Sequence, residues 1–189
     1  EIALILKEMA ERGETVEEIA GMASVMREMS AYVNAPDAFD NCGTGGSGIS
    51  RINTSTMAAF ILAAGGLKVA KHGNRAAGGR CGSFDVLEAI GVKIELMPTD
   101  VEKTIKELGI GFMYAPFFHP AMKHVMPARK SLGIRTVFNV LGPLTNPARV
   151  KKQLIGTTDQ ETAEKLIQVL QELGHERAIV VFGSDGLDE

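Results

Sequence analysis

The fold of this chain is decided by residues 41–56, which read Asn41-Cys-Gly-Thr-Gly-Gly-Ser-Gly-Ile-Ser-Arg-Ile-Asn-Thr-Ser-Thr56. Four glycines fall within six residues of this stretch, and an apolar run from Met57 to Ala64 follows it. Glycine allows backbone N–H groups to turn inward and to approach an anion closely. A helix N-terminus adds free N–H groups and the positive end of the helix dipole. The stretch therefore predicts a phosphate-binding loop and helix start, although a surface loop before an ordinary capped helix would look similar.

A second stretch strengthens the phosphate-binding interpretation. It runs from Lys71-His-Gly-Asn-Arg75 to Gly82-Ser83 and brings two permanent cations together with Gly78, Gly79 and Gly82. Neither stretch is a nucleotide-binding signature of the common kinds, because no Gly-Lys-Ser/Thr closes the first loop and no acidic residue follows at the dinucleotide spacing. Two glycine-rich basic loops predict one large polyanionic ligand.

The composition limits the class of protein. The 189 residues suffice for one domain or slightly more, and 45% are hydrophobic while 23% are charged. The sequence contains no run of 18 apolar residues, which predicts a soluble globular protein without a membrane span. A formal net charge of −3 argues against general nucleic-acid binding. Cys42 and Cys81 are expected to be reduced thiols, and we expect a cytoplasmic protein.

Helical and strand patterns alternate along the chain. Helices are expected over 2–9, from Val16 onward, and over 53–64, 83–90, 99–108, 121–132 and 160–173. Strands are expected over 39–42, 67–70, 92–96, 110–115, 154–156 and 178–182. Thr15 with Glu18, and Thr99 with Glu102, match capping boxes. Ser83 and Asp159 are expected N-caps, and 142–147 a rigid Pro/Gly turn. This alternation predicts an α/β fold with a mostly parallel central sheet.

The two ends of the sequence suggest that it is part of a longer chain. Helical rhythm is already present at Ile2 without a preceding N-cap, no signal peptide is apparent, and the sequence stops directly after a strand. The first two helices carry so much apolar surface that they need a partner, either further helices or a second subunit. After the last strand, Asp185, Asp188 and Glu189 form a carboxylate cluster that suits Mg²⁺ opposite a phosphate site, unless it is simply a solvated acidic loop.

The motifs together resemble the anthranilate phosphoribosyltransferase family. They are Gly43-Thr-Gly-Gly46, Asn53-Thr-Ser-Thr56, Lys71-His-Gly-Asn-Arg75, Gly82-Ser83-x-Asp85, His119-Pro-Ala-Met-Lys-His124, Leu141-Gly-Pro-Leu-Thr-Asn-Pro147 and Asp185-Gly-Leu-Asp-Glu189. The resemblance implies a glycosyltransferase of tryptophan biosynthesis that joins anthranilate to phosphoribosyl pyrophosphate (PRPP) with Mg²⁺. It also implies a homodimer and two domains. A small α-helical domain would comprise 1–35 and about 119–146, and a larger α/β domain 36–118 and 147–189.

The resemblance also assigns site residues by position. Those expected to contact PRPP are Gly43, Gly46, Ser47, Arg51, Asn53, Thr54, Ser55, Thr56, Lys71, His72, Gly73, Asn74, Arg75, Ala76, Ala77, Gly78, Gly79 and Ser83. Those expected to contact anthranilate are Gly43, Asn74 and Arg129, with His72, His119 and Pro143 lining the aromatic site. Ser55, Asp188 and Glu189 resemble the Mg²⁺ ligands.

Three positions depart from the family pattern. Ser47 stands where the family usually has Asp, Arg51 replaces a small hydroxyl residue, and the loop 76–81 has fewer serines. We expect these changes to affect metal and substrate affinity more than the type of reaction.

No residue is assigned as a general base, because the aromatic amine of anthranilate is uncharged at neutral pH. His72 could receive a proton, but hydrogen bonding and positioning are its favoured role. Two alternatives to the transferase stay open at this point. One is an enzyme like pyrimidine nucleoside phosphorylase, and the other is a non-catalytic nucleic-acid-binding relative.

Overall fold

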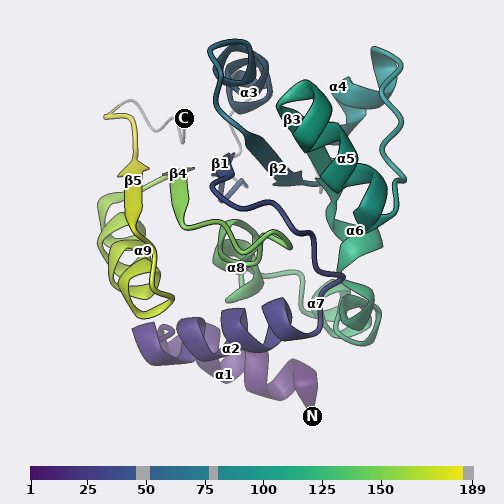
Figure 1. Ribbon diagram of the computed structural model, residues 1–189. Coiled ribbons are helices and arrows are strands. Elements are labelled where there is room, and N and C mark those ends of the chain that lie inside the picture. Colours follow the sequence, from purple (N-terminus) through teal and green to yellow (C-terminus); the bar gives the residue numbers. More distant parts are fainter. Residues whose placement is uncertain (46–51, 77–80, 185–189) are drawn as a thin grey trace.

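A computed structural model describes residues 1–45, 52–76 and 81–184 (Figure 1). Several residues expected in the site therefore lie outside the described residues: Gly46, Ser47, Arg51, Ala77, Gly78, Gly79, Asp188 and Glu189. Asp185, the first residue of the expected carboxylate cluster, lies outside them as well.

A five-stranded sheet forms the centre of the molecule, in the order β3-β2-β1-β4-β5. All neighbouring strands are parallel, which confirms the predicted α/β fold. The strands are β1 (Phe39–Gly43), β2 (Val69–Gly73), β3 (Ile110–Tyr114), β4 (Lys152–Gly156) and β5 (Arg177–Val181). Because the strands run in one direction, their carboxyl ends share one edge of the sheet.

Helices cover the sheet and extend beyond it at one end (Figure 1). They are α1 (Ile2–Arg12), α2 (Val16–Glu28), α3 (Thr54–Ala64), α4 (Ser83–Ala89), α5 (Pro98–Leu108), α6 (Ala115–Phe118), α7 (Met126–Leu132), α8 (Phe138–Leu144) and α9 (Gln160–Glu172), with a 3-10 helix at Pro120–His124. Helix α3 contacts β1, β2 and β3, α5 contacts β3, and α9 contacts β5. Helix α2 contacts α8 and α9, while α1 contacts α7.

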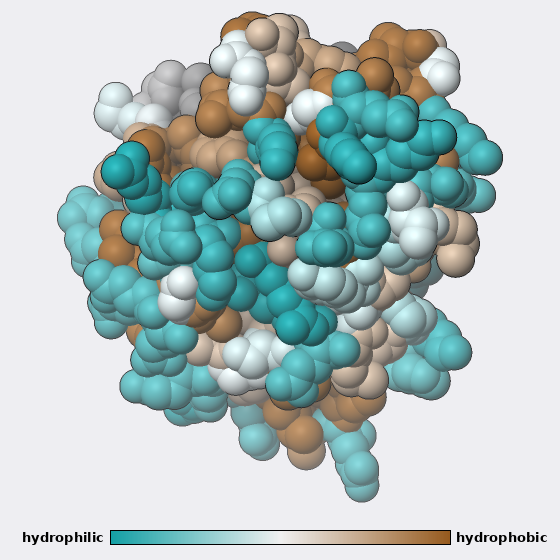
Figure 2. Space-filling model, in the orientation of Figure 1, coloured by the Kyte–Doolittle hydropathy of each residue, from teal (hydrophilic) through white to brown (hydrophobic). Residues whose placement is uncertain are grey.

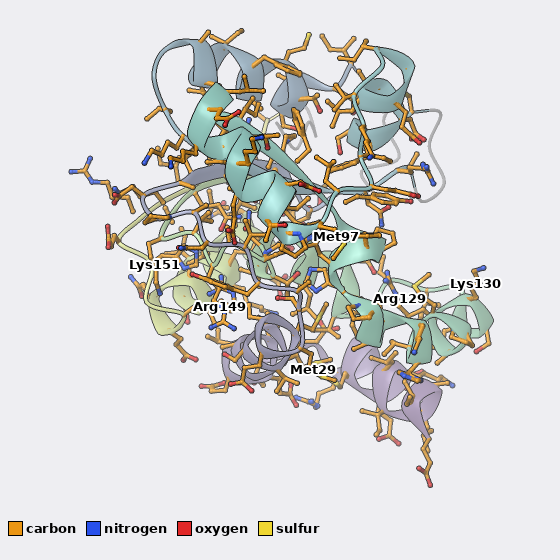
Figure 3. All side chains as sticks on the ribbon, turned by 45° about the vertical axis from the view of Figure 1, so that its right-hand side comes forward. Met29, Met97, Arg129, Lys130, Arg149 and Lys151 are labelled. Atoms are coloured by element: carbon orange, nitrogen blue, oxygen red, sulfur yellow. The ribbon has the colours of Figure 1, made fainter. Side chains whose placement is uncertain are left out.

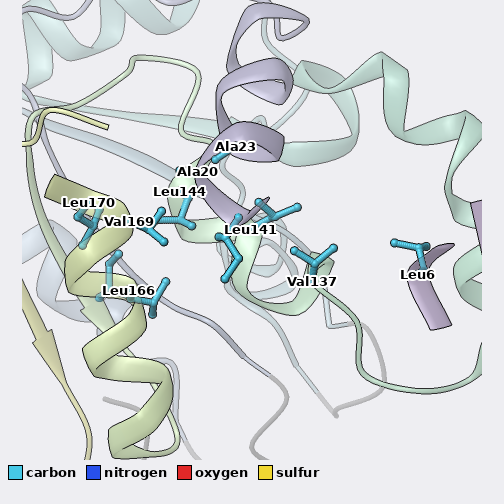
Figure 4. Packing of buried hydrophobic residues seen from close by; sticks show 11 residues of the cluster. Leu6, Ala20, Ala23, Val137, Leu141, Leu144, Leu166, Val169 and Leu170 are labelled. Atoms are coloured by element: carbon cyan, nitrogen blue, oxygen red, sulfur yellow. The ribbon is translucent and has the colours of Figure 1, made fainter. Parts of the chain in front are cut away.

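The largest buried cluster joins the N-terminal helices to the sheet (Figure 4). It contains Leu6 of α1, Ala20 and Ala23 of α2, Leu141 and Leu144 of α8, Ile155 of β4, and Leu166 and Leu170 of α9. Burying one such leucine stabilises the fold by about 1.5–3 kcal/mol. The helices of 1–35 and 119–146 thus contact each other and the sheet through α8 and α9. The expected division into two domains stays a prediction.

Two of the predicted helix caps are confirmed. Thr15 accepts a hydrogen bond from the Glu18 amide at 3.2 Å, and the Glu18 carboxylate accepts one from the Thr15 amide at 3.0 Å. Asp159 caps α9 by accepting from the Thr162 amide at 2.8 Å. The polar side chains at these positions therefore fix where α2 and α9 begin.

Other local predictions were wrong. Helix α4 is capped at Gly82 rather than at Ser83, and α5 begins at Pro98 after Met97 without a side-chain cap. Proline suits the first turn of a helix, so α5 begins before the Thr99 hydroxyl could cap it. Residues 92–96 form no strand. Ile94, in the middle of the alternating apolar and charged residues, is buried in one cluster with Phe84 and Leu87 of α4.

The region from Pro120 to Pro147 also differs from its prediction. The expected helix 121–132 is split into a 3-10 turn and α7, because prolines stand at 120 and 127. The expected rigid turn at 142–147 is partly helical, since α8 continues through Gly142 and Pro143 to Leu144. Pro143 lies inside this short helix and has no N–H to donate to the preceding turn.

Apolar side chains remain exposed over two helices (Figure 2). On α1 they are Ile2, Leu4 and Ile5, and on α3 they include Met57 and Ile61. The exposure of α1 agrees with the expectation that the first helices need a partner.

Candidate active site

The carboxyl edge of the sheet gathers most of the described residues that were expected to bind PRPP. Gly43 ends β1 and Gly73 ends β2, while α3 and α4 begin shortly after these strands. Asn53, Thr54, Ser55 and Thr56 lie at the start of α3, Asn74, Arg75 and Ala76 follow β2, and Ser83 begins α4. In open parallel sheets, ligands bind outside the carboxyl ends of the strands. The two sequence stretches thus meet at the edge where a ligand is expected.

One side-chain hydrogen bond fixes the start of α3 within the first stretch, and another joins the first stretch to the second. The Asn41 amide group donates to the Ser55 carbonyl oxygen at 2.8 Å, which ties β1 to the first turn of α3. Asn53 precedes α3, and its side chain donates to the Cys81 carbonyl at 3.4 Å. The N-terminus of α3 is thereby fixed at the edge, where its dipole favours an anion. Thr56, which was also expected to contact PRPP, is buried, because only 2% of its surface is exposed.

A hollow of about 460 Å³ lies between α3 and α4 at this edge. Asn53, Thr56 and Cys81 line it together with apolar residues of both helices. Its volume is in the range of small-molecule sites. Residues expected to bind PRPP therefore border an open space.

Lys71 points into the sheet rather than toward the edge. Its side chain is 1% exposed, and its ammonium group donates to the Asn41 carbonyl at 2.6 Å. Burial raises the pKa of the neighbouring Asp40 carboxyl, and the Lys71 charge opposes that shift. The structure therefore shows Lys71 holding two strands together, and no contact with a ligand at the edge follows from its position.

Arg75 reaches the edge but is engaged within the protein. Its guanidinium donates twice to the Glu88 carboxylate, at 2.7 Å each, and once to the Tyr114 hydroxyl at 2.9 Å. It also lies over the Tyr114 ring, 4.9 Å from the centroid. Its positive charge is therefore largely compensated before any ligand binds.

His72 and His119 form a buried pair. Their Nε2 atoms are 3.2 Å apart, and the His72 Nδ1 lies 3.2 Å from the Gly142 carbonyl oxygen. Burial, with the His119 charge second, lowers the pKa of His72 to about 3. Burial also lowers the pKa of His119 to about 4. Both rings are neutral at pH 7, and such a His72 is a weak base, which supports the positioning role over proton transfer.

Arg129 and Pro143 lie in the helical part of the chain. Arg129 is half-buried near the end of α7, with its guanidinium 5.1 Å from the Phe138 ring centroid. Burial lowers the pKa of this guanidinium. Figure 3 shows Arg129 beside Lys130 and apart from Arg149 and Lys151. Pro143 is buried in α8, and its carbonyl accepts from the Gln153 amide at 2.7 Å. A contact of either residue with anthranilate stays a prediction.

Asp40 was not among the residues predicted from the sequence, yet it holds together the residues beneath the candidate site. Asp40 is fully buried and accepts from the Asn146 side chain at 2.8 Å and from the His72 amide at 3.3 Å. Asn146 also donates to the Ala70 carbonyl at 2.8 Å. A signal was present, because an acidic residue inside a strand of a sheet that is covered by helices requires a buried partner.

The described residues contain no group of three or more His, Cys, Asp or Glu side chains that could hold a metal ion. Of the expected Mg²⁺ ligands, Ser55 is described and lies at the carboxyl edge in the first turn of α3. Hydroxyl and carboxylate oxygens are donors that Mg²⁺ accepts. The donor set expected from the sequence therefore fits the ion chemically, with its carboxylates outside the described residues.

Comparison with known proteins identifies the family. The family model described as the glycosyl transferase family, a/b domain, matches residues 35–189. The chain belongs to the glycosyl transferase family. Among curated relatives, anthranilate phosphoribosyltransferase of Alkaliphilus metalliredigens is 53% identical over 94% of this chain and 53% of its own length. The enzyme of the same name from Herpetosiphon aurantiacus is 54% identical over 100% of this chain and 56% of its own length.

Solved structures give the same result for this glycosyl transferase chain. Anthranilate phosphoribosyltransferase of Thermus thermophilus superposes with a TM-score of 0.92 at 48% identity, covering 99% of this chain and 57% of that one. The Saccharomyces cerevisiae enzyme in complex with PRPP and Mg gives 0.90 at 34% identity, covering 100% and 54%. The predicted resemblance is confirmed, and the chain spans about half the length of the relatives it matches. These relatives give no support to the phosphorylase-like or nucleic-acid-binding alternatives.

Across the described parts of the chain, every helix is too short or too polar to cross a membrane.

Proposed function

We propose that the protein transfers the 5-phosphoribosyl group from PRPP to the amine of anthranilate and releases pyrophosphate, as an enzyme of tryptophan biosynthesis. The observation that carries this proposal is the meeting of the described parts of both stretches at the carboxyl edge, where hydrogen bonds fix the α3 N-terminus. The names of its relatives support the same activity, and the Saccharomyces cerevisiae enzyme was solved both with PRPP and Mg and with 4-fluoroanthranilate.

In this proposal the described edge residues hold the phosphate groups and the ribose. Gly43, Asn53, Thr54, Ser55, Asn74 and Ser83 provide backbone N–H groups, amides and hydroxyls there. Donors placed where negative charge develops stabilise a departing pyrophosphate. Mg²⁺, held by Ser55 with Asp188 and Glu189, would neutralise part of that charge when bound.

The proposed reaction is a substitution at the anomeric carbon of the ribose. A C–N bond to the anthranilate nitrogen forms, the C–O bond to pyrophosphate breaks, and the proton that the amine loses is released to solvent with the pyrophosphate. An uncharged aromatic amine needs no strong base to attack, so the protein mainly positions both substrates. The low pKa of His72, about 3, agrees with a site that does not rely on this side chain as a base.

The proposal includes a homodimer, formed through the helical segments 1–35 and 119–146, and a cytoplasmic location. The exposed Ile2, Leu4 and Ile5 of α1 support a protein interface on that side. Both cysteines are free thiols, which suits a reducing compartment. Arg129 and Asn74 are proposed contacts of the anthranilate carboxylate, directly or through water.

The test uses the full-length protein with PRPP, Mg²⁺ and anthranilate, and follows the loss of anthranilate fluorescence. The loss is expected to require all three components. Ser55→Ala should raise the Mg²⁺ concentration needed for the half-maximal rate, because the hydroxyl proposed to bind the ion is removed. Ser30→Ala is the matched control, since its hydroxyl donates to the Arg27 carbonyl on α2, away from the edge.

Three results would be informative. Loss of fluorescence with all components, reduced in Ser55→Ala but not in Ser30→Ala, establishes the transferase. Binding of PRPP without consumption of anthranilate indicates a different acceptor. A protein that does not bind PRPP at all contradicts the proposed function.

A further inference from the structure

The two ends of the second stretch lie in unusually close contact. A Cβ atom added to Gly82 would lie 2.6 Å from the Arg75 carbonyl carbon and would also collide with the Ala76 nitrogen. One added to Gly73 would lie 2.7 Å from the Ser83 hydroxyl oxygen. These distances leave no room for a side chain. The backbone before residue 77 is thus placed directly against the backbone before α4.

Asp85 bridges these two ends. Its Oδ2 atom accepts from the Gly82 amide at 2.7 Å and from the Ala76 amide at 2.9 Å. The Gly82 bond belongs to the start of α4, where the third residue of a helix commonly bonds back to the N-cap. The Ala76 bond spans nine residues and contributes nothing to the helix. It ties the residues after β2 to α4.

A second tie lies one helical turn further along α4. Glu88 follows Asp85 by three residues, so both side chains lie on the same side of α4. Its bidentate bond to Arg75 and the Arg75 bond to Tyr114 hold the segment after β2 from two directions. The Ser83 hydroxyl adds a bond to the Asn74 carbonyl at 3.2 Å.

The charges here are opposite to those expected of ligand-binding groups. Asp85 and Glu88 are carboxylates beside a segment proposed to hold a polyanion, and a like charge weakens such binding. The two backbone N–H groups, first that of Ala76 and then that of Gly82, lower the pKa of Asp85, which therefore stays charged at neutral pH. Asp85 therefore cannot contribute by attracting the polyanion, and its contribution must be structural.

We propose that Asp85 is a positioning residue for PRPP. By accepting from both Ala76 and Gly82, it holds Asn74 and Ser83 in the arrangement that the ligand requires before the ligand arrives. This inference rests on the proposed function, because it assumes that PRPP binds at this edge. Preorganised groups bind more tightly because less conformational entropy is lost on binding.

The test compares Asp85→Asn and Asp85→Ala in the full-length protein. Positioning predicts that the KM for PRPP rises by about tenfold or more in Asp85→Ala, with a smaller rise in Asp85→Asn, whose amide oxygen can still accept. The KM for anthranilate should rise less than the KM for PRPP, because Ser83 is a proposed contact of PRPP alone, whereas Asn74 is a proposed contact of both substrates. Asp85 is half-exposed, so both variants should fold, which thermal unfolding checks.

The control is Asp100→Asn, which removes an exposed carboxylate from the first turn of another helix, α5. Simple repulsion by Asp85 would give the opposite sign, since both Asp85 variants would then bind PRPP more tightly. A KM for PRPP that falls or stays unchanged in Asp85→Ala overturns the inference while the proposed function stands.

Calorimetric titration with PRPP and Mg²⁺ separates the two proposals. If the wild type binds PRPP but does not consume anthranilate, the proposed acceptor fails, and the affinities of the Asp85 variants still decide the inference. If the wild type does not bind PRPP, both proposals are overturned.

Discussion

The same sequence motifs place polar side chains in two contrasting regions, the interior of the sheet and its carboxyl edge. In the interior, Lys71 and Asn146 are at most 1% exposed and bond to backbone carbonyls and to Asp40. At the edge, Asn74 and Arg75 are exposed, and Arg75 bonds to an exposed carboxylate. Residues next to each other in a motif can therefore serve different purposes. The interior group fixes the strands, and the edge group borders the proposed ligand site.

Removing the interior carboxylate should have the largest effect. Asp40→Ala leaves the Asn146 amide, the His72 amide and the Lys71 ammonium without their buried acceptor or counter-charge. Each buried donor left without its acceptor costs about 1–3 kcal/mol. The free energy of unfolding in urea should fall by this amount for each donor, whereas Glu95→Ala, at an exposed position, should change it by less than about 0.5 kcal/mol. Equal stability of the two variants would remove the distinction between interior and edge.

Lys71→Met tests the interior role of the residue that the sequence assigned to the ligand. The substitution leaves Asp40 buried beside an apolar side chain, so we expect a loss of about 3 kcal/mol. Lys68→Met changes an exposed lysine three residues earlier and should be nearly neutral. If Lys71→Met unfolds like the wild type and fails only to bind PRPP, the lysine belongs to the edge group.

The buried histidines should make the interior sensitive to acid. The pKa values of His72 and His119 are lowered to about 3 and about 4, while the unfolded chain binds protons near pH 6.5. Stability is then full above pH 6.5 and falls toward pH 4, by about 2 kcal/mol per histidine at pH 5. The raised pKa of Asp40 acts in the opposite direction in this range. Melting temperatures between pH 7.5 and 5 should fall less steeply in His119→Gln than in the wild type.

The matched control for that series is His124→Gln, which removes an exposed histidine of the 3-10 turn. Its melting temperature should follow the wild-type pH profile. A parallel profile for His119→Gln would show that the buried pair does not cause the acid sensitivity.

The smallest loss of stability is expected at a helix cap, because its hydrogen bonds are exposed to solvent. Thr15→Ala removes a formed capping box and should cost about 1 kcal/mol. Thr99→Ala, at a similar sequence pattern that forms no cap, should cost much less. Equal losses in urea unfolding would mean that propensity rather than the cap accounts for the change.

Features of the fold that depend on a few neighbouring residues were predicted well from the sequence. The alternation of apolar runs indicated the parallel sheet, and Thr15 and Asp159 indicated the starts of α2 and α9. Features that depend on contacts with distant segments of the chain were not predicted well. The alternation at 92–96 predicted a strand, but these residues meet no partner strand among the described parts of the chain, and Ile94 is buried against other side chains instead.

The candidate site divides in the same way. The glycine-rich stretches and their meeting at one edge followed from the sequence, because parallel strands bring their carboxyl ends together. That Arg75 is bound to Glu88, and that Asp85 closes the segment between β2 and α4, could not be predicted. Those contacts join residues that are 9 and 13 positions apart in the sequence, and local spacing does not bring such residues together.

By itself, the sequence determined the α/β fold and the family resemblance, and it predicted the phosphate-binding character of the two stretches. All three depend on local spacing of glycine, apolar and polar residues, which one chain segment carries alone. Only the tertiary structure decided which polar residues are interior and which are at the edge. Lys71 and Arg75 differ by four positions and carry the same charge, yet one is buried against Asn41 and the other is exposed beside Glu88. The physical reason is that burial is a property of the elements packed around a residue, and these elements come from distant parts of the chain.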